Sequence, residues 1–250
     1  HELRIATNGG GALSAQAGLY YFREESHVNY GFRDLELVGL PPFYVFDTGP
    51  VMARSRAAFG QATYSVSPQL RLTAGARYTG DDKSRVGTTN FQQAQAFNPA
   101  TDLRLLNAAS LNTHKTTWRL GADYDLAPGT LAYGTVSTGY KAGGFNEGCL
   151  AGTSGVGMDC PAAMAVPANT LLYQPEQLRS YEAGLKTRFW HKRDSLNVTA
   201  FDYDYTNLQL SGVAIVNGAP RFVTTNAGSA SVKGLEVEGM VNATASGSFN

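Results

Sequence analysis

The sequence lacks the features that mark helical membrane proteins and nucleic-acid-binding proteins. Its 20 basic and 20 acidic side chains give a formal net charge of zero. The chain therefore lacks the excess of basic residues that is typical of nucleic-acid-binding proteins, and no nucleic-acid partner is expected. No run approaches the roughly 18 apolar residues that a membrane helix needs. No segment shows a convincing helical period of 3.6 residues, so a helical fold is not expected.

Signatures of catalysis are also missing. The chain has no G-x-S-x-G, no H-E-x-x-H and no glycine-rich phosphate loop followed by Lys and Ser or Thr. The four histidines are scattered and form no metal-ligand spacing: His1, His27, His114 and His191. We therefore expect no enzyme activity and no catalytic, cofactor-binding or metal-binding residues.

Glycine and aromatic residues are abundant instead. The chain contains 28 Gly, 13 Tyr and 12 Phe, and 43% of its residues are hydrophobic. This composition suits many strands joined by turns and loops. The apolar content is high enough that global disorder is not expected.

Side chains alternate in character along several segments. In residues 70–79, LRLTAGARYT, the even positions are apolar or small, whereas the odd positions include Arg71 and Arg77. Period-two alternation predicts a strand with one apolar and one polar side. The pattern recurs in residues 12–22, 58–66, 117–126, 181–189 and 233–241. In all, about nine antiparallel strands are expected.

Short and long connections alternate between these strands. Tight turns are expected at residues 67–69, 127–130 and 191–194, and long irregular loops at 26–50, 81–112 and 141–177. In an up-and-down sheet, alternate connections lie at the same end. One end of the sheet is thus predicted to carry short turns and the other long loops.

Two architectures use such strands. A soluble sandwich buries its apolar face, whereas an outer-membrane barrel turns that face to lipid and its polar face inward. Apolar-face aromatics gather near strand ends, where membrane barrels carry girdles: Tyr64, Tyr78, Tyr124, Tyr181 and Phe189. Together with the loop asymmetry, this favours the membrane barrel. A passive porin-like channel and a secreted β-sandwich binding protein remain as alternatives.

The strand that starts at Ser195 has a mixed pattern. Its early positions alternate properly, but Phe201, Tyr203 and Tyr205 then occupy the opposite parity. Either a β-bulge or an aromatic cluster on the inner side explains this pattern.

An ordered series of segments resembles the barrel of TonB-dependent outer-membrane receptors, especially the iron-siderophore-receptor-like group. The series is YGTVSTGYKAGGFN, YQPEQLRSYEAGLKTRFW, LNVTAFDYDYTNLQ and TTNAGSASVKGLEVEG, with HELRIATNGGGALSAQAGLYYF and FGQATYSVSPQLRLTAGARYT before them. The resemblance spans nearly the whole chain. It implies a 22-stranded barrel, of which residues 1–250 would be an internal portion without the plug domain and the C-terminal strands.

The resemblance also implies a function and a location. Such receptors bind a scarce nutrient, such as a ferric siderophore, and import it with energy from the TonB–ExbB–ExbD complex acting through the plug. The expected location is the outer membrane of a Gram-negative bacterium, with outer-membrane lipid and lipopolysaccharide as further partners. In such an exported barrel, Cys149 and Cys160 are expected to form a disulfide within one long loop.

Candidate site residues follow from the barrel interpretation. Ligand contacts are expected from loop aromatics and one arginine, which can hold a chelate by stacking and charge: Tyr30, Arg33, Phe43, Tyr44, Phe46 and Phe145. For any one of them, packing on a neighbouring loop is the competing role. Charged residues expected to face the lumen, as charge ladders or plug contacts, are Arg71, Arg77, Arg119, Asp123, Glu182, Lys186, Arg188, Glu236 and Glu238.

Overall fold

The computed structural model describes residues 1–250 except 8–9, 34–41, 156–157, 190–193, 217–218 and 242–250. Nine strands follow one another across a ten-stranded antiparallel sheet in the order β1-β2-β3-β4-β6-β7-β12-β13-β16, and the short strand β5 (Leu103–Leu106) pairs with the end of β4. Their bounds are β1 Glu2–Ala6, β2 Leu13–Arg33, β3 Phe43–Ser65, β4 Leu70–Gln92, β6 Ala109–Ala127, β7 Thr130–Lys141, β12 Glu176–Phe189, β13 Asp194–Thr206 and β16 Ser229–Met240. The expected number of antiparallel strands is confirmed.

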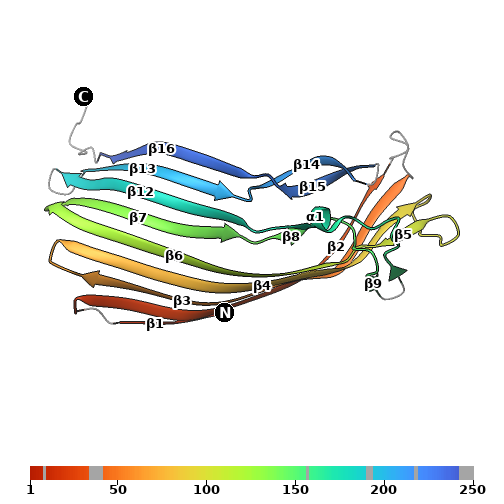
Figure 1. Ribbon diagram of the computed structural model, residues 1–250, viewed down its shortest axis with the longest axis horizontal. Helices are drawn as coiled ribbons and strands as arrows, with labels where there is room; N and C mark the ends of the chain where they lie inside the picture. The colour runs from red at the N-terminus through yellow and green to blue at the C-terminus, as the bar shows by residue number, and fades with distance from the viewer. Residues whose placement is uncertain (8–9, 34–41, 156–157, 190–193, 217–218, 242–250) are drawn as a thin grey trace, which may run out of the picture.

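Smaller elements lie at one end of this sheet (Figure 1). They are β5 Leu103–Leu106, β8 Gly144–Phe145, β9 Ser154–Gly155, β10 Met158–Asp159, α1 Ala168–Leu171, β11 Leu172–Tyr173, β14 Gln209–Val216 and β15 Ala219–Asn226. The short turns at 67–69 and between β6 and β7 lie at the opposite end of the sheet. The expected turn at 191–194 lies outside the described residues except for Asp194, which begins β13. We call the two ends the loop end and the turn end. Within the described part of the chain, no helix is long and apolar enough to cross a bilayer.

The strand register separates the side chains onto two faces. Leu72 pairs with Ala122 and belongs to the side we call the apolar face, whereas Arg71 pairs with Asp123 on the other side, the polar face. All nine charged residues expected to face the lumen share the polar face by register. The alternation of apolar and polar residues in the sequence thus corresponds to two faces of the sheet, one apolar and one polar.

The apolar face is uncovered along the strands. Leu72 is 45% exposed, Leu120 54% and Leu185 46%. A sandwich would bury these side chains against a second sheet. Within the described residues, the buried hydrophobic clusters lie elsewhere, in the elements at the loop end. The fold is therefore an open segment of a barrel wall, with β1 and β16 as its edges.

Two of the expected long loops are largely strand. β2 continues to Arg33 and β3 begins at Phe43, so most of 26–50 is paired, and β4, β5 and β6 together occupy most of 81–112. The sequence misled because the pairing shifts between Ser26 and Val28 and between Thr48 and Val51, which breaks the alternation. A long connection between β13 and β16, with the β14–β15 hairpin, was not expected.

The strand from Ser195 is regular. β13 pairs without a register shift on both sides, so the bulge interpretation is wrong. Instead, the rings of Phe201 and Tyr203 stack at 4.8 Å, and the Tyr203 hydroxyl donates to Glu182 Oε1 at 2.8 Å. Gly234 leaves the space for this stack, because a Cβ there would lie 2.5 Å from the Phe201 ring.

Candidate functional site

The candidate site lies on the polar face at the loop end, where β2, β3 and β4 extend past their neighbours. The bulge between Thr48 and Val51 reverses the parity of β3. Beyond it Phe46 pairs with Thr89, and Tyr44 pairs with Phe91, so these aromatic side chains turn onto the polar face. The bulge is therefore the feature that directs aromatic rings to this face.

Four of these rings pack together. Tyr30 stacks on Phe46 with 4.7 Å between ring centroids. Tyr44 contacts Phe46 edge-on at 4.7 Å and Phe91 at 4.7 Å. Phe46 is buried, whereas Tyr30 remains 48% exposed. Tyr30 is thus the ring of this cluster that is most available to a bound molecule.

The loop between β7 and β12 is fastened to this aromatic cluster by a carboxylate. The Tyr44 hydroxyl donates to Glu147 Oε1 at 2.5 Å, and the Thr89 hydroxyl donates to the same oxygen at 2.7 Å. Hydrogen bonds to a charged acceptor are stronger than those between neutral groups. Glu147 is therefore a main anchor of the loop.

Arg85 holds the same loop from β4. Its Nη2 donates to the Asn146 carbonyl at 2.7 Å, and its guanidinium carbon lies 4.8 Å from the centroid of the Phe145 ring. The Asn146 side chain in turn donates to the Thr170 and Thr224 carbonyls, at 2.7 and 2.8 Å, and accepts from the Thr224 amide at 2.7 Å. One asparagine thus joins the loop to α1 and to the β14–β15 hairpin.

Burial changes the titration of two anchoring groups. Desolvation, with the nearby Glu147 carboxylate, raises the pKa of Tyr44 well above its usual value. Desolvation lowers the pKa of Arg85 to about 10, although Glu147 opposes the shift. Among the described residues, no acceptor reaches the buried Arg85 Nε. Both groups keep their usual charge at neutral pH, Tyr44 as a donor and Arg85 as a cation.

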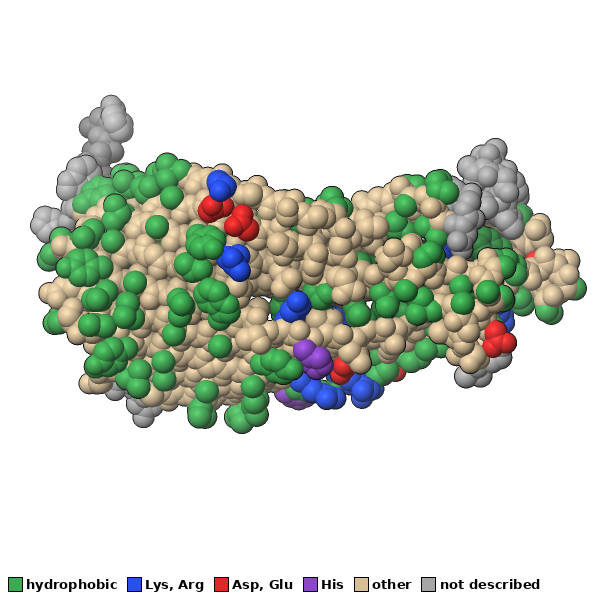
Figure 2. Space-filling view, viewed as in Figure 1, with side chains coloured by type: hydrophobic (Ala, Val, Ile, Leu, Met, Phe, Trp, Pro, Cys, Tyr) green, Lys and Arg blue, Asp and Glu red, His purple; other side chains and the backbone are tan. Residues whose placement is uncertain are grey.

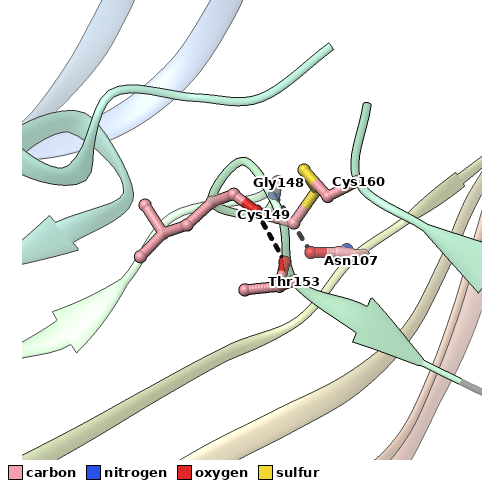
Figure 3. Close-up of a disulfide and its surroundings, with 6 residues drawn as sticks. Asn107, Gly148, Cys149, Thr153 and Cys160 are labelled. Carbon is pink, nitrogen blue, oxygen red and sulfur yellow. Dashed lines mark hydrogen bonds between the residues drawn. A yellow bond between two sulfur atoms is a disulfide. The ribbon is translucent and has the colours of Figure 1, made fainter. Parts of the chain in front are cut away.

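A disulfide closes the central part of the loop (Figure 3). Cys149 and Cys160 are bonded, with 2.03 Å between the sulfurs, and pack with Leu106 in a buried cluster. The Gly148 amide donates to Asn107 Oδ1 at 3.1 Å, and the Thr153 hydroxyl donates to the Leu150 carbonyl at 2.6 Å.

A second apolar cluster ties the loop to the β14–β15 hairpin. Val166 and Leu171 from the loop pack against Val216 and Val223 from the hairpin, and all four are buried. Gly148 has a φ of +122°, and a Cβ there would lie 2.0 Å from Val166 Cγ2. Glycine is therefore required where the loop enters this cluster.

The structure unites some of the expected ligand contacts and separates others. Tyr30, Tyr44, Phe46 and Phe145 belong to one group on the polar face. Arg33 and Phe43 pair with each other at the rim, with the guanidinium carbon 5.9 Å from the ring centroid.

Tyr44 and Phe145, which were expected to contact a ligand, instead contact other residues of the protein. Tyr44 and Phe145 contact Glu147 and Arg85, so they hold the loop. Arg85, Asn146 and Glu147 were not predicted, because Asn146 and Glu147 lie in a loop and Arg85 lies in a part of β4 that was expected to be a loop, and neither segment shows a periodic pattern. The adjacent Phe145-Asn146-Glu147 run, which combines an aromatic with two hydrogen-bonding side chains, was the available clue.

Residues on the polar face between the site and the turn end form local charge and ring contacts. Arg71 donates to both carboxylate oxygens of Asp125, at 2.5 and 3.0 Å. The Arg77 guanidinium carbon lies 5.0 Å from the Tyr20 ring centroid, and Lys186 Nζ lies 5.0 Å from that of Tyr133. These contacts give the polar face a fixed, charged surface.

Comparison with known proteins points to one family. Residues 2–250 match the family model for the TonB dependent receptor-like β-barrel. The pesticin receptor of Yersinia pestis is 26% identical over 239 residues, which cover 95% of this chain and 30% of the receptor.

Solved structures share the fold. The ferric yersiniabactin uptake receptor FyuA from Yersinia pestis superimposes with a TM-score of 0.68 at 21% identity, over 95% of this chain and 31% of its own. The ferric-catecholate import receptor Fiu from E. coli K12 gives 0.65 at 16% identity, over 98% and 35%. The chain thus spans about a third of the length of these relatives, which are transport receptors and not enzymes.

Proposed function

Because the chain belongs to the TonB dependent receptor-like β-barrel family, we propose that it is the wall segment of an active-transport receptor in the outer membrane of a Gram-negative bacterium. The complete receptor binds a scarce nutrient such as a ferric siderophore and imports it with energy from the TonB–ExbB–ExbD complex. Members of this family are outer-membrane proteins that bind siderophores and other nutrients and interact with TonB. Like its relatives, the protein is a receptor and not an enzyme.

In this proposal, residues 1–250 form part of a 22-stranded barrel, and the plug domain and the remaining strands belong to the complete protein. The open edges at β1 and β16 support it, because an open sheet cannot persist in hydrocarbon. The exposed apolar face then contacts lipid, and the polar face, which includes the nine charged residues predicted to face the lumen, lines the lumen. The nutrient enters from the loop end.

One observation carries the choice of a receptor over a passive pore. The loop between β7 and β12 is closed by a disulfide and clamped through Glu147 and Arg85 onto the polar face at the loop end. A loop that is fixed over the lumen narrows the entrance and presents a defined surface, which suits recognition of one ligand. Tyr30 and neighbouring loop residues are the proposed ligand contacts.

The test is uptake of radiolabelled ferric siderophores by cells that carry or lack the complete gene, under iron restriction. We expect uptake that requires both the gene and TonB and that stops when the proton-motive force is dissipated. Gene-dependent uptake of many small solutes without TonB would instead identify a passive channel. Recovery of the complete protein in the soluble fraction would contradict the membrane location itself.

A further inference from the structure

On the apolar face, charged residues are confined, with one exception, to the part of the strands nearer the loop end. The register defines one row across the sheet, which runs through Ala62, Ala74, Leu120, Val136, Tyr181, Asp202 and Lys233. On β13 and β16 the first charges, counted from the turn end, lie in this row, and they pair at 2.8 Å between Lys233 Nζ and Asp202 Oδ2. Asp194 at the start of β13 is the exception, a buried residue at the turn end.

On four other strands the first charge lies further toward the loop end. Arg179 lies two residues beyond the row on β12, Asp82 eight on β4, Arg56 six on β3 and Arg23 eight on β2, counted from Tyr181, Ala74, Ala62 and Ala15. Within the described residues, the apolar face of β1, β6 and β7 carries no Asp, Glu, Lys or Arg. The boundary thus advances by about one to one and a half residues per strand.

This advance matches the tilt of strands in a membrane barrel. From β16 to β3 there are six strand-to-strand steps, or about 29 Å at ~4.8 Å per step. The accompanying shift of six residues is about 20 Å at ~3.3 Å per residue. The ratio gives a tilt of about 35°, and barrel strands tilt by roughly 35–45°. The outward charges therefore lie at one level of the bilayer, its outer interface.

Three arginines gather at this level on neighbouring strands. Arg23 and Arg54 are directly opposite each other in the register, and Arg56 follows two residues along β3 on the same face. Like charges directly opposite destabilise a sheet unless an anion lies between them. Figure 2 shows basic side chains gathered along the lower edge of the view, where β2 and β3 run.

Protein carboxylates neutralise this cluster only in part. Arg23 Nη2 pairs with Glu25 Oε2 at 2.8 Å. Asp82 is opposite Arg54 in the register, on the side away from Arg23. Within the described residues, neither Arg54 nor Arg56 forms an ion pair. Two guanidinium groups are thus available to an anion from outside the protein.

The neighbouring surface on the turn-end side is apolar and aromatic. Leu19 is 60% exposed, Tyr78 is 55% exposed, and both pair with Ala58 in the row next to Arg56. A ligand that fits has acyl chains on the membrane side and phosphate at the interface. Because the arginines lie on the loop-end side of the lipid-facing surface, which adjoins the outer leaflet in the proposed function, we propose that Arg23, Arg54 and Arg56 bind a phosphate group of lipopolysaccharide.

The proposal rests on the proposed membrane location and is tested on the complete receptor, purified in detergent from outer membranes. Bound lipopolysaccharide is measured by native mass spectrometry, and binding of added lipid A is compared with that of its dephosphorylated form and of phosphatidylglycerol. The variants are Arg54→Gln with Arg56→Gln, the charge-conserving pair Arg54→Lys with Arg56→Lys, and Arg119→Gln as the control on the polar face.

We expect the double Gln variant to retain at least tenfold less lipopolysaccharide, and the Lys pair and the Arg119→Gln control to retain most of it. Dephosphorylated lipid A should bind no better to the native receptor than to the double Gln variant. Equal retention by the double Gln variant, or equal binding of phosphatidylglycerol and lipid A, would overturn the assignment. Heat-modifiable migration in gels verifies that each barrel is folded, and membrane fractionation tests the proposed location separately.

Discussion

The Glu147 anchor makes a quantitative prediction about the loop between β7 and β12. One carboxylate oxygen accepts from both Tyr44 and Thr89. Bonds to a charged acceptor contribute about 1.5–3 kcal/mol each, and those between neutral groups about 0.5–1.5 kcal/mol. Glu147→Gln keeps the shape and removes the charge, so two bonds each weaken by about 1 kcal/mol. An opening free energy lower by about 2 kcal/mol raises the open population about 30-fold.

Hydrogen exchange measured by mass spectrometry on the complete receptor is the assay, because protection reports local opening. Peptides that cover residues 142–155 should exchange about 30-fold faster in Glu147→Gln and also faster in Tyr44→Phe. Tyr124→Phe is the control, since this tyrosine lies on the apolar face near the turn end. Unchanged protection in both Glu147→Gln and Tyr44→Phe would refute the anchor.

The same anchor has a defined pH dependence. Because the folded pKa of Tyr44 is raised above the ordinary value of 10, its contribution is complete below pH 10 and is lost only as pH rises toward the higher folded value. Between pH 10 and 11, where an exposed tyrosine titrates, Tyr44 should stay protonated. The absorbance of the native receptor at tyrosinate wavelengths should then differ little from that of Tyr44→Phe.

Three further sets of substitutions test the two faces of the sheet, the β-bulge and the disulfide. Leu120→Arg places a charge on the apolar face and should lower stability by about 2–4 kcal/mol in folding titrations into lipid vesicles, whereas Thr135→Arg on the polar face should be nearly neutral. Gly87→Ala should disrupt the β3–β4 pairing at the bulge, because its Cβ would lie 2.4 Å from backbone, and proteolysis in the 43–48 region should increase; an intact segment would contradict the packing. Replacing Cys149 and Cys160 by Ser should destabilise the loop by about 3 kcal/mol, from the closure of a roughly 12-residue loop, and exchange there that matches the native protein would contradict this.

The part of the fold nearest the turn end could be predicted from the sequence. There each face of a strand lies in a single environment, so the alternation in residues 70–79 and 181–189 reports directly which side chains share a face. Beyond the level of Arg56, both faces of the sheet are polar or packed by loops. The period-two signal then disappears although the strands remain paired, so the sequence predicts loops where β2, β3 and β4 extend.

The candidate site was predictable only in its aromatic members. Tyr30, Tyr44 and Phe46 stood out as rings in one segment, but their common face depends on the bulge between Thr48 and Val51. A β-bulge interrupts the period-two pattern, so the sequence does not indicate which face the residues beyond the bulge share. Glu147 and Arg85 come together from segments more than 60 residues apart, and such a contact follows from tertiary packing alone.

The most direct test of the account is the environment of alternate side chains along β4. Spin labels at successive positions from 70 to 79, in the complete receptor reconstituted in bilayers, report contact with lipid-soluble oxygen or with a water-soluble nickel reagent. The account predicts oxygen contact at Leu70, Leu72 and Ala74, and nickel contact at Arg71 and Thr73. Nickel contact at Leu72 and Ala74, or no alternation at all, would contradict it.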